Sequence, residues 1–467
     1  MNLNENGMAL LRILLCMLCF LPLLSSRALA EGFSMTEWSA RGLSLAGGLV
    51  ARADDASAVA YNPAGITQLP GMRLMAGTSL IAPYGQIETR DSAVGTHTTD
   101  VRPAAWFPPH LYATWQVNED WWLGFGVFSR FGLGNQYASN WPGRMAVYNV
   151  GMQTLSANPV IAYKVNDWLS LSVGAEFMYM SIFMESKIQS VKGANPAYNP
   201  ATAPITGAKP LLIDRPENNM NLEGDSLGIG MNAAAHIRFS EHWSAGLTYR
   251  SQMTQNIQGR VTYDGQYPLA RVQPMPGARP EYRVTIPGTE FRNSDANATL
   301  QLPDSAALAV MWRPLPNLSF EAGAIWTRWS TYNALNIYTD AGRNSLNQKS
   351  FRDGWNFNAS VEYSPLDWLA LRLGYWHETP VVNDTYADYL LPTNGRDGIM
   401  AGVGFKWDNW TLDLAYAHLW IYPVSYDKSA ARDAAIAATN NQQARLLPGT
   451  SKNTCAEMFS MSLGYSF

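Results

Sequence analysis

The sequence of 467 residues is poor in charge and in cysteine, and it has no long apolar run after residue 30. Only 15% of its residues are charged, against about 25% in typical soluble domains. Two of the three cysteines, Cys16 and Cys19, lie in an apolar segment near the start, which leaves Cys455 as the single thiol of the remaining chain. One thiol excludes an internal disulfide framework and a zinc site built from cysteines. The lack of a further run of about 18 apolar residues excludes a transmembrane helix.

Motifs that carry chemistry are also missing. The formal net charge of −4 leaves no basic surface, so nucleic acid is excluded as a partner. None of the six histidines has the H-E-x-x-H spacing of a zinc enzyme. No G-x-S-x-G nucleophile motif occurs either. We therefore expect no enzymatic activity, no metal site and no cofactor.

The start of the chain is typical of an export signal. An apolar run begins at Met8 and is followed by the small-x-small triplet Ala-Leu-Ala at 28–30. This pattern predicts a secretory signal peptide over residues 1–30, cleaved after Ala30. A start at Met8 rather than Met1 suits the signal better, because MALLR supplies a basic residue. An exported chain with 12% aromatic residues and no spanning helix has one way to cross a membrane, a closed β-barrel that satisfies every backbone group.

A short unit recurs along the rest of the chain: a turn with Asp, Asn, Glu or Pro, usually a Trp, and then an alternating strand. The six copies are VNEDWWLGFGV, VNDWLSLSVGAEF, SEHWSAGLTY, PLPNLSFEAGA, SPLDWLALRLGYW and WDNWTLDLAYA. Long polar stretches separate them, at about 85–105, 133–148, 188–222, 262–296, 338–353, 378–396 and 424–454. Six short turns and seven long loops connect 14 strands, and bacterial outer-membrane barrels have an even number of strands with short periplasmic turns. We predict an all-β fold, a 14-stranded antiparallel transmembrane β-barrel over residues 70–467.

Alternation within the strands supports the barrel. In the last strand, Phe459 and Met461 fall on one face and Ser460 on the other, the apolar-out and polar-in pattern of a membrane barrel. The strand ends on Phe467. A terminal aromatic residue resembles the signal read by the outer-membrane assembly machinery, which we expect as a partner. A barrel that closes on itself has no free edge, so we expect a monomer.

Residues 31–69 lack strand alternation and are rich in Gly and Ala, which predicts an N-terminal hatch, a plug inside the lumen. The stretch ADDASAVAYNPAGITQLPG closely resembles the hatch of the FadL/TodX family, outer-membrane transporters of long-chain fatty acids and other hydrophobic compounds. The matching residues are Gly32, Phe33, Asp54, Asp55, Ala56, Ser57, Asn62, Pro63 and Ala64. We expect the Asp and Asn side chains to hold the hatch's own turn through bonds to its backbone, and the Pro to fix the local backbone.

The resemblance implies a function. The chain is expected to take up long-chain fatty acids or similar hydrophobic small molecules across the outer membrane of a Gram-negative bacterium. Extracellular loops, 188–222 and 262–296, would capture the substrate, the lumen under the hatch would bind it, and a kink in the third strand would release it sideways into outer-membrane lipid. The alternatives are a transporter of aromatic or alkane hydrocarbons with the same fold, and, in a different class, a general porin or a surface receptor barrel.

The third strand contains the glycines that a kink would use. It reads WWLGFGVFSRFGLGNQY, with Gly124, Gly126, Gly132 and Gly134. Glycine inside a strand marks bulges, bends or close approach. We predict that these four residues form the lateral gate; the alternative at each position is an ordinary lumen-facing glycine beneath the hatch.

A fatty carboxylate needs a cation in an apolar lumen. Strand alternation directs Arg250 inward, and Arg328 is a second candidate, so both are predicted to bind substrate through a fork that matches two carboxylate oxygens. Arg372 also points inward but should pair with Glu362 across a tight turn. The resemblance further implies that Phe33 reaches the binding pocket; the alternative is packing within the hatch.

Overall fold

The computed structural model describes residues 32–91, 95–102, 104–188, 191–194, 212–215, 217–264, 270–273, 282–284, 292–341, 344–426 and 447–467. The predicted signal peptide lies outside the described residues, as does much of the loops 188–222, 262–296 and 424–454. None of the helices within these ranges is both long enough and apolar enough to span a membrane.

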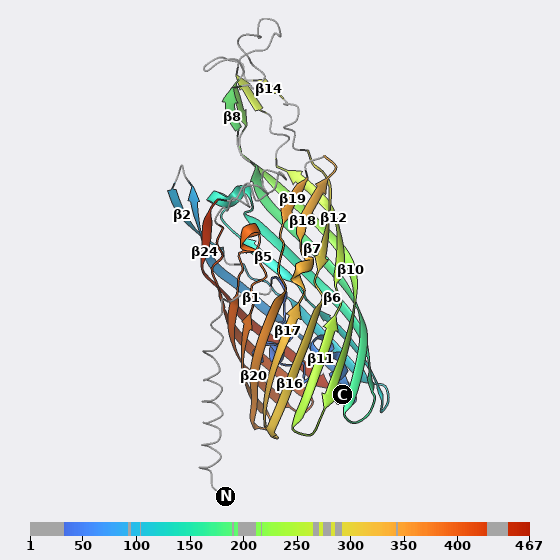
Figure 1. The fold of residues 1–467 in the computed structure, drawn as a ribbon. Coiled ribbons are helices and arrows are strands. Elements are labelled where there is room, and N and C mark those ends of the chain that lie inside the picture. The colour runs from blue at the N-terminus through green and yellow to red at the C-terminus, as the bar shows by residue number, and fades with distance from the viewer. Residues whose placement is uncertain are drawn as a thin grey trace.

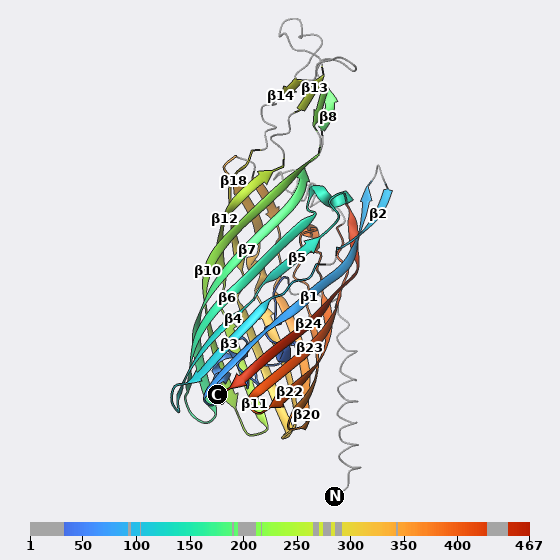
Figure 2. The same ribbon diagram turned by 180° about the vertical axis from the view of Figure 1, so that it is seen from behind.

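Fourteen antiparallel strands close into a tilted barrel, as predicted (Figures 1 and 2). The wall strands are β1 (Met72–Asp91), β3 (Pro109–Gln116), β4 (Trp121–Phe128) continued by β5 (Gly132–Gln136), β6 (Asn149–Lys164), β7 (Leu169–Ile188), β10 (Asn218–Arg238), β11 (Trp243–Arg250) continued by β12 (Met253–Tyr263), β15 (Ser294–Leu302) continued by β16 (Ser305–Leu315), β17 (Leu318–Thr327) continued by β18 (Ala334–Thr339), β20 (Gly354–Leu366), β21 (Leu369–Glu378), β22 (Arg396–Trp407), β23 (Trp410–Ile421) and β24 (Gly449–Ser466). The barrel closes where β24 pairs with β1, with Ser466 opposite Arg73; the two strands lie side by side in Figure 2.

The predicted short turns are confirmed. They all lie at the end of the barrel drawn at the bottom of Figure 1, and the long connections lie at the other end. The short turns comprise residues 117–120, 165–168, 239–242, 316–317, 367–368 and 408–409. Two further strands, β2 (Gly95–Asp100) and β19 (Ser345–Gln348), extend the wall toward the long loops.

Alternation sets which side chains face lipid. On β24, Phe459 and Met461 are 51% and 50% exposed, whereas Ser460 and Ser462 between and beyond them are buried against the lumen contents. The outer face is therefore apolar, as a barrel in a bilayer requires.

The two loops expected to capture substrate each contribute strands to a small sheet. Strands β8 (Val191–Ala194) and β9 (Leu212–Arg215) come from one loop, and β13 (Ala270–Gln273) and β14 (Tyr282–Val284) from the other. Strands β9 and β13 pair, so the loops are joined by backbone hydrogen bonds. This sheet stands above the long-loop end in Figure 1.

Residues 32–69, the hatch, lie inside the barrel and contact its inner wall on both sides. Helix α2 (Ala40–Ser44) packs against β22 and β23, and the 3₁₀ helix η2 (Pro63–Gln68) packs against β6, β7 and β10. Between them, α3 (Ala58–Tyr61) packs against β4.

Candidate functional site

Asn62 fixes the turn between α3 and η2. Its Oδ1 accepts a hydrogen bond from the backbone N–H of Ala64 at 3.1 Å, and its Nδ2 donates to the carbonyl oxygens of Val50 at 2.7 Å and Ala235 at 3.1 Å. Pro63 takes the first position of η2, where a missing N–H breaks no helical bond. Ala235 lies in β10, so the side chain that shapes the hatch also ties it to the wall.

Asp54 and Asp55 take part in a charged network at the short-turn end. Both bind Nη1 of Arg41 in α2, at 2.6 and 3.0 Å. The same guanidinium donates to both oxygens of Glu362 in β20. Glu362 also accepts from Nε of Arg372 at 2.6 Å, so the pair expected across the tight turn is present. Arg41 was missed in the sequence analysis; it connects the Glu362–Arg372 pair of the wall to the hatch.

Glu321 of β17 holds the loop between α2 and α3. Its buried carboxylate accepts hydrogen bonds from three consecutive backbone N–H groups, of Val50 at 3.0 Å, Ala51 at 3.1 Å and Arg52 at 2.8 Å. A buried carboxylate is stable only when its oxygens are satisfied in this way. The wall and the hatch therefore depend on each other for polar partners.

The third wall strand breaks between β4 and β5, at residues 129–131. At the break, the start of the hatch takes the place of a neighbouring strand. The backbone N–H of Met35 donates to the carbonyl of Arg130 at 2.9 Å, and that of Gly132 donates to the carbonyl of Phe33 at 3.0 Å. The strand thus departs from the regular wall within the glycine-rich stretch that the sequence singled out.

Glu176 of β7 lies beside the break, between two arginines. Its Oε2 accepts hydrogen bonds from Nη1 of Arg130 at 3.2 Å and from Nη1 of Arg250 at 3.0 Å, and its Oε1 accepts from Oγ of Ser156 at 2.8 Å. Nη2 of Arg250 donates to the carbonyl of Ala60 at the end of α3, at 2.6 Å. All three charged side chains are buried. Arg250 therefore joins β7, β11 and the hatch.

The glycines before the break make room for the hatch. A Cβ atom at Gly124 or at Gly126 would lie 2.9 Å from a methyl carbon of Val59 in α3. Such a distance is shorter than packed carbon atoms tolerate. These two positions match the alternative of lumen-facing glycines beneath the hatch, and their part in a lateral gate stays a prediction.

The glycines after the break have different neighbours. A Cβ atom at Gly132 would lie 2.6 Å from Sδ of Met35 in the hatch. A Cβ atom at Gly134 would collide with the indole ring of Trp106, which comes from the segment between β2 and β3. These two glycines line the gap beside the break, and their role as a gate also stays a prediction.

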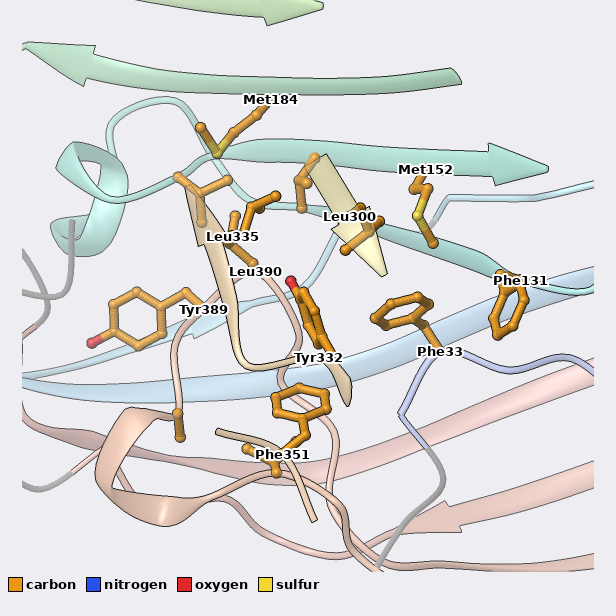
Figure 3. Packing of buried hydrophobic residues seen from close by; sticks show 14 of the residues in the cluster. Phe33, Phe131, Met152, Met184, Leu300, Tyr332, Leu335, Phe351, Tyr389 and Leu390 are labelled. Atoms are coloured by element: carbon orange, nitrogen blue, oxygen red, sulfur yellow. The ribbon is translucent and has the colours of Figure 1, made fainter. Parts of the chain in front are cut away.

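Phe33 packs among aromatic rings in the lumen. Its ring centroid lies 4.5 Å from that of Trp329, 5.6 Å from that of Tyr332 and 6.0 Å from that of Phe131, each edge to face. Figure 3 shows the ring between Tyr332 and Phe131. Edge-to-face packing adds to the free energy of burial. Gly32 before it has a φ of +38° and lies against Trp329, so a side chain there would be strained as well as crowded.

An apolar cavity lies on the long-loop side of Phe33; we name it the upper cavity. Its volume is about 60 Å³, because its own side chains nearly fill it. Charged groups within its lining are few. Among the residues that line it are Phe33, Met152, Met184, Leu300, Tyr332, Leu335, Phe351, Lys349, Asp388 and Leu390.

A second cavity lies beside the strand break; we name it the exit cavity. Its volume is about 490 Å³, and Phe33 lines it as well as the upper cavity. Leu155 and Tyr179 also line it, although their side chains are 40% and 50% exposed on the outer face of the wall. The exit cavity therefore extends from the lumen to the lipid-facing surface.

The cations predicted to bind substrate lie outside both cavities. Arg250 is held by Glu176, and Arg328 by Asp304 with Nε and Oδ1 2.7 Å apart. Neither appears in the lining of the upper or the exit cavity, and their role as carboxylate anchors stays a prediction. The lysine that lines the upper cavity is Lys349, missed in the sequence because it follows the four-residue strand β19, which is too short to show a clear alternation.

One buried carboxyl group, Glu37 of the hatch, lines the exit cavity near Arg396 of β22. Burial raises the pKa of the Glu37 carboxyl, and the positive charge of Arg396 opposes that rise. Arg396 itself binds Glu378 of β21. Within the part of the chain that the structure describes, no group of three or more His, Cys, Asp or Glu side chains could hold a metal ion.

Comparison with known proteins gives consistent matches. Residues 21–467 match the family model described as outer membrane protein transport protein (OMPP1/FadL/TodX). The long-chain fatty acid transport protein of Salmonella typhi is 25% identical over 390 residues, 83% of this chain and 86% of that protein. The crystal structure of a Pseudomonas aeruginosa FadL homologue superposes with a TM-score of 0.75 at 18% identity, covering 94% and 100% of the two chains. The Pseudomonas putida toluene transporter TodX gives a TM-score of 0.64 at 13% identity, with the same coverage.

Proposed function

The chain belongs to the outer membrane protein transport protein family (OMPP1/FadL/TodX) and is an outer-membrane transporter of hydrophobic compounds, and we propose that its own substrates are long-chain fatty acids. In this proposal the loops 188–222 and 262–296 capture the molecule. It then binds in the upper cavity and leaves through the exit cavity, sideways into the membrane.

One observation carries the route: the exit cavity joins lumen-facing Phe33 to lipid-facing Leu155 and Tyr179. Each methylene group gains about 0.8 kcal/mol by staying out of water. A path that ends in the bilayer keeps the acyl chain in apolar surroundings, whereas a path to the periplasm releases it into water. The lumen below the cavities is also filled by α2, α3 and η2.

Binding in the upper cavity requires side chains to move, because the cavity volume is only about 60 Å³. Met152 and Met184 line it, and their unbranched side chains adapt readily to a new neighbour. Phe33 lies between the two cavities and lines both of them, as Leu133, Met152 and Leu391 also do. Its displacement by an acyl chain would join the two spaces, so binding and onward movement would be coupled.

Lys349 supports a substrate with a carboxylate. It is buried in the lining of the upper cavity, and its ammonium group binds the carboxylate of Asp388. A buried ion pair is costly compared with apolar side chains of the same size. An ammonium group with donors to spare in an apolar cavity offers a fatty carboxylate the charged partner that it needs.

The same pair also supports the second candidate, a transporter of aromatic or alkane hydrocarbons. Asp388 already neutralises Lys349, and the third charged residue of the lining, Glu223, is itself acidic, so the cavity carries no net positive charge to attract an anion. Under this alternative the pair is structural, and the substrate contacts the apolar lining alone.

Uptake of labelled oleate and labelled toluene separates the two. Cells without a transporter of their own would carry the wild type or the double variant Lys349→Met/Asp388→Asn, which removes the pair without leaving a lone buried charge. For a fatty-acid transporter we expect oleate uptake to fall by roughly tenfold, the worth of a hydrogen bond to a charged group, and toluene uptake to be unaffected.

Arg328→Ala is the matched control, because it removes a partly exposed cation outside both cavities. A loss of oleate uptake in this variant alone would place the anchor at Arg328. Entry of toluene without oleate would establish the hydrocarbon alternative. Entry of neither compound would overturn transport of both substrate classes.

A further inference from the structure

The wall has a gap beside the strand break. Strand β4 pairs with β3, with Leu111 opposite Val127, but β5 pairs with β6 and, among the described residues, with no strand on its other side. Residue 106, which precedes β3, instead forms an isolated bridge with Ile81 of β1. The N–H of Arg102 reaches the carbonyl of Gln136 at the end of β5, at 2.7 Å, and between this bond and the strand break the two neighbouring segments of the wall are separated.

The indole of Trp106 fills this gap. It lies where Gly134 of β5 has no side chain, since a Cβ atom there would collide with Cζ2 and Cε2 of the ring. A Cβ atom at Gly151 of β6 would lie 3.0 Å from Cη2 of the same ring. The six-membered ring thus rests across two neighbouring strands, and both carry glycine at the point of contact.

The ring stands between the lumen and the lipid. Trp106 lines the exit cavity together with Met35 of the hatch on the inner side and Leu155 on the outer side. Its backbone is anchored to β1 in both directions, with N–H to the carbonyl of Ile81 at 3.0 Å and carbonyl to the N–H of Ile81 at 2.9 Å. The side chain can therefore rotate without the strand moving. Gly134 and Gly151 leave room for its ring, and the ring of Phe183 also lies over Gly151.

The polar atom of the ring is unused. Nε1 of Trp106 is buried and has no hydrogen-bond partner among the described residues. Buried indole N–H groups normally have an acceptor, and an unpaired one in a native protein calls for an explanation. The exit cavity that this side chain lines has a largely apolar wall with a few polar residues, and none of them is bonded to this N–H, so a molecule in the cavity can supply the missing acceptor.

We propose that Trp106 closes the lateral exit and that its indole N–H donates a hydrogen bond to the polar head of the departing substrate. The inference rests on the proposed lateral release, and it deepens that function in one respect. It selects a substrate with an oxygen acceptor, the carboxyl group of a fatty acid, over a plain hydrocarbon.

Closure is tested without transport. In a Cys455→Ser background, Met35→Cys places a thiol behind the ring, in the exit cavity. The protein is placed in phosphatidylcholine vesicles, and the thiol is labelled with pyrenylmaleimide dissolved in the bilayer. We expect Trp106→Ala to accelerate labelling by roughly tenfold, because thiol reactivity follows access. Trp106→Phe keeps a ring in the gap, so it should be labelled at the same rate as the protein that retains Trp106. Equal rates in the wild type and Trp106→Ala would overturn closure.

A water-soluble sulfonated maleimide gives the control for loosening of the whole barrel. Its labelling rate should not change in either variant. Faster labelling by both reagents would mean that the substitution unfolds the wall locally, and this result would also overturn Trp106 as a specific closing residue.

The donor is tested by uptake. Trp106→Phe keeps the ring and removes the N–H, so oleate uptake should fall by roughly three- to tenfold, while toluene uptake stays within about twofold of wild type. An equal effect on both compounds, or none on oleate, would overturn the donor role. If the wild type took up neither compound, the proposed function would fail, and the labelling result for closure would still stand.

Discussion

Arg41 and Glu362 face each other with two parallel hydrogen bonds, Nε to Oε2 at 2.9 Å and Nη2 to Oε1 at 2.7 Å. One residue belongs to the hatch and the other to the wall, so a bidentate ion pair joins the two parts of the molecule. Both side chains are shielded from water, at 11% and 14% exposure, and breaking a buried pair leaves an uncompensated charge.

Replacing Arg41 with Ala should therefore loosen the hatch. Glu362 and Asp54 would lose their shared cation, and we expect the free energy of unfolding to fall by about 3 kcal/mol. Guanidinium-induced unfolding in detergent, followed by tryptophan fluorescence, measures the change. Arg313→Ala is the control: its guanidinium is 38% exposed and lies 3.6 Å from Asp54, so its loss should cost at most about 1 kcal/mol. Equal losses of unfolding free energy in the two variants would show that the Arg41–Glu362 pair stabilises the protein no more than an exposed ion pair does.

Replacing Glu176 with Gln should destabilise the region of the strand break. Arg130 and Arg250 would remain buried beside a neutral amide, at a cost of about 3 kcal/mol in the same unfolding experiment. Glu185→Gln on the same strand is the matched control, since Glu185 is only partly buried and accepts from a neutral Asn149. Adding Arg130→Met to Glu176→Gln should recover part of the loss. No recovery would mean that the carboxylate acts through packing alone.

Truncation of Phe33 should speed exchange between the two cavities. Phe33→Ala removes the ring that lines both spaces, whereas Phe351→Ala removes a ring that lines the upper cavity only. Each substitution costs about 3 to 5 kcal/mol of packing, so stability alone cannot distinguish them. We expect a fluorescent fatty acid to leave the Phe33→Ala protein roughly tenfold faster than the Phe351→Ala protein, a barrier difference of about 1.4 kcal/mol. Stopped-flow transfer to acceptor vesicles measures both rates, and equal rates would contradict a dividing role for Phe33.

Glu37 should make stability depend on pH. Burial raises the pKa of the Glu37 carboxyl in the native protein. The native protein therefore keeps a proton on this group that the unfolded chain releases at about pH 4.3. The native state then binds more protons than the unfolded state, so the free energy of unfolding falls as the pH rises from that value through the native pKa. Arg396 and Glu378, which bind each other, are the charged neighbours of Glu37.

The variant Glu37→Gln should flatten this dependence. Between about pH 4 and pH 8 the wild type should lose more stability than the variant, with Glu119→Gln, in an exposed turn, behaving like the wild type. Parallel curves for all three proteins would mean that the Glu37 proton is not retained in the native state.

Local sequence patterns predicted the wall well, because the alternation within each strand indicates which side chains face the lumen and which face lipid. Asn356 and Asn358 are buried on the lumen side while Trp355 and Phe357 are exposed, as alternation indicates. Ion pairs between strands that a tight turn connects could be predicted equally well, since the turn fixes the register of the two strands. The Glu362–Arg372 ion pair follows from that register.

Contacts across the lumen could not be predicted in the same way. Alternation directs Arg250 inward but says nothing of its height, and the tilt of the strands decides whether it meets a cavity or, as found, Glu176 and the hatch. The meeting of Trp106 with Gly151 depends on the break between β4 and β5, which lies between them in the wall. These contacts depend on the geometry of the whole closed barrel, so no local pattern in the sequence predicts them.

The three N–H bonds from the hatch to Glu321 favour one order of assembly. A barrel that closed around an empty lumen would enclose this carboxylate in its wall without its amide partners. This penalty does not arise if the hatch is already between the strands when β24 meets β1. Maturation in the outer membrane should therefore proceed with the sheet folding around its plug, and the closing seam between the first and last strands should form as the final step.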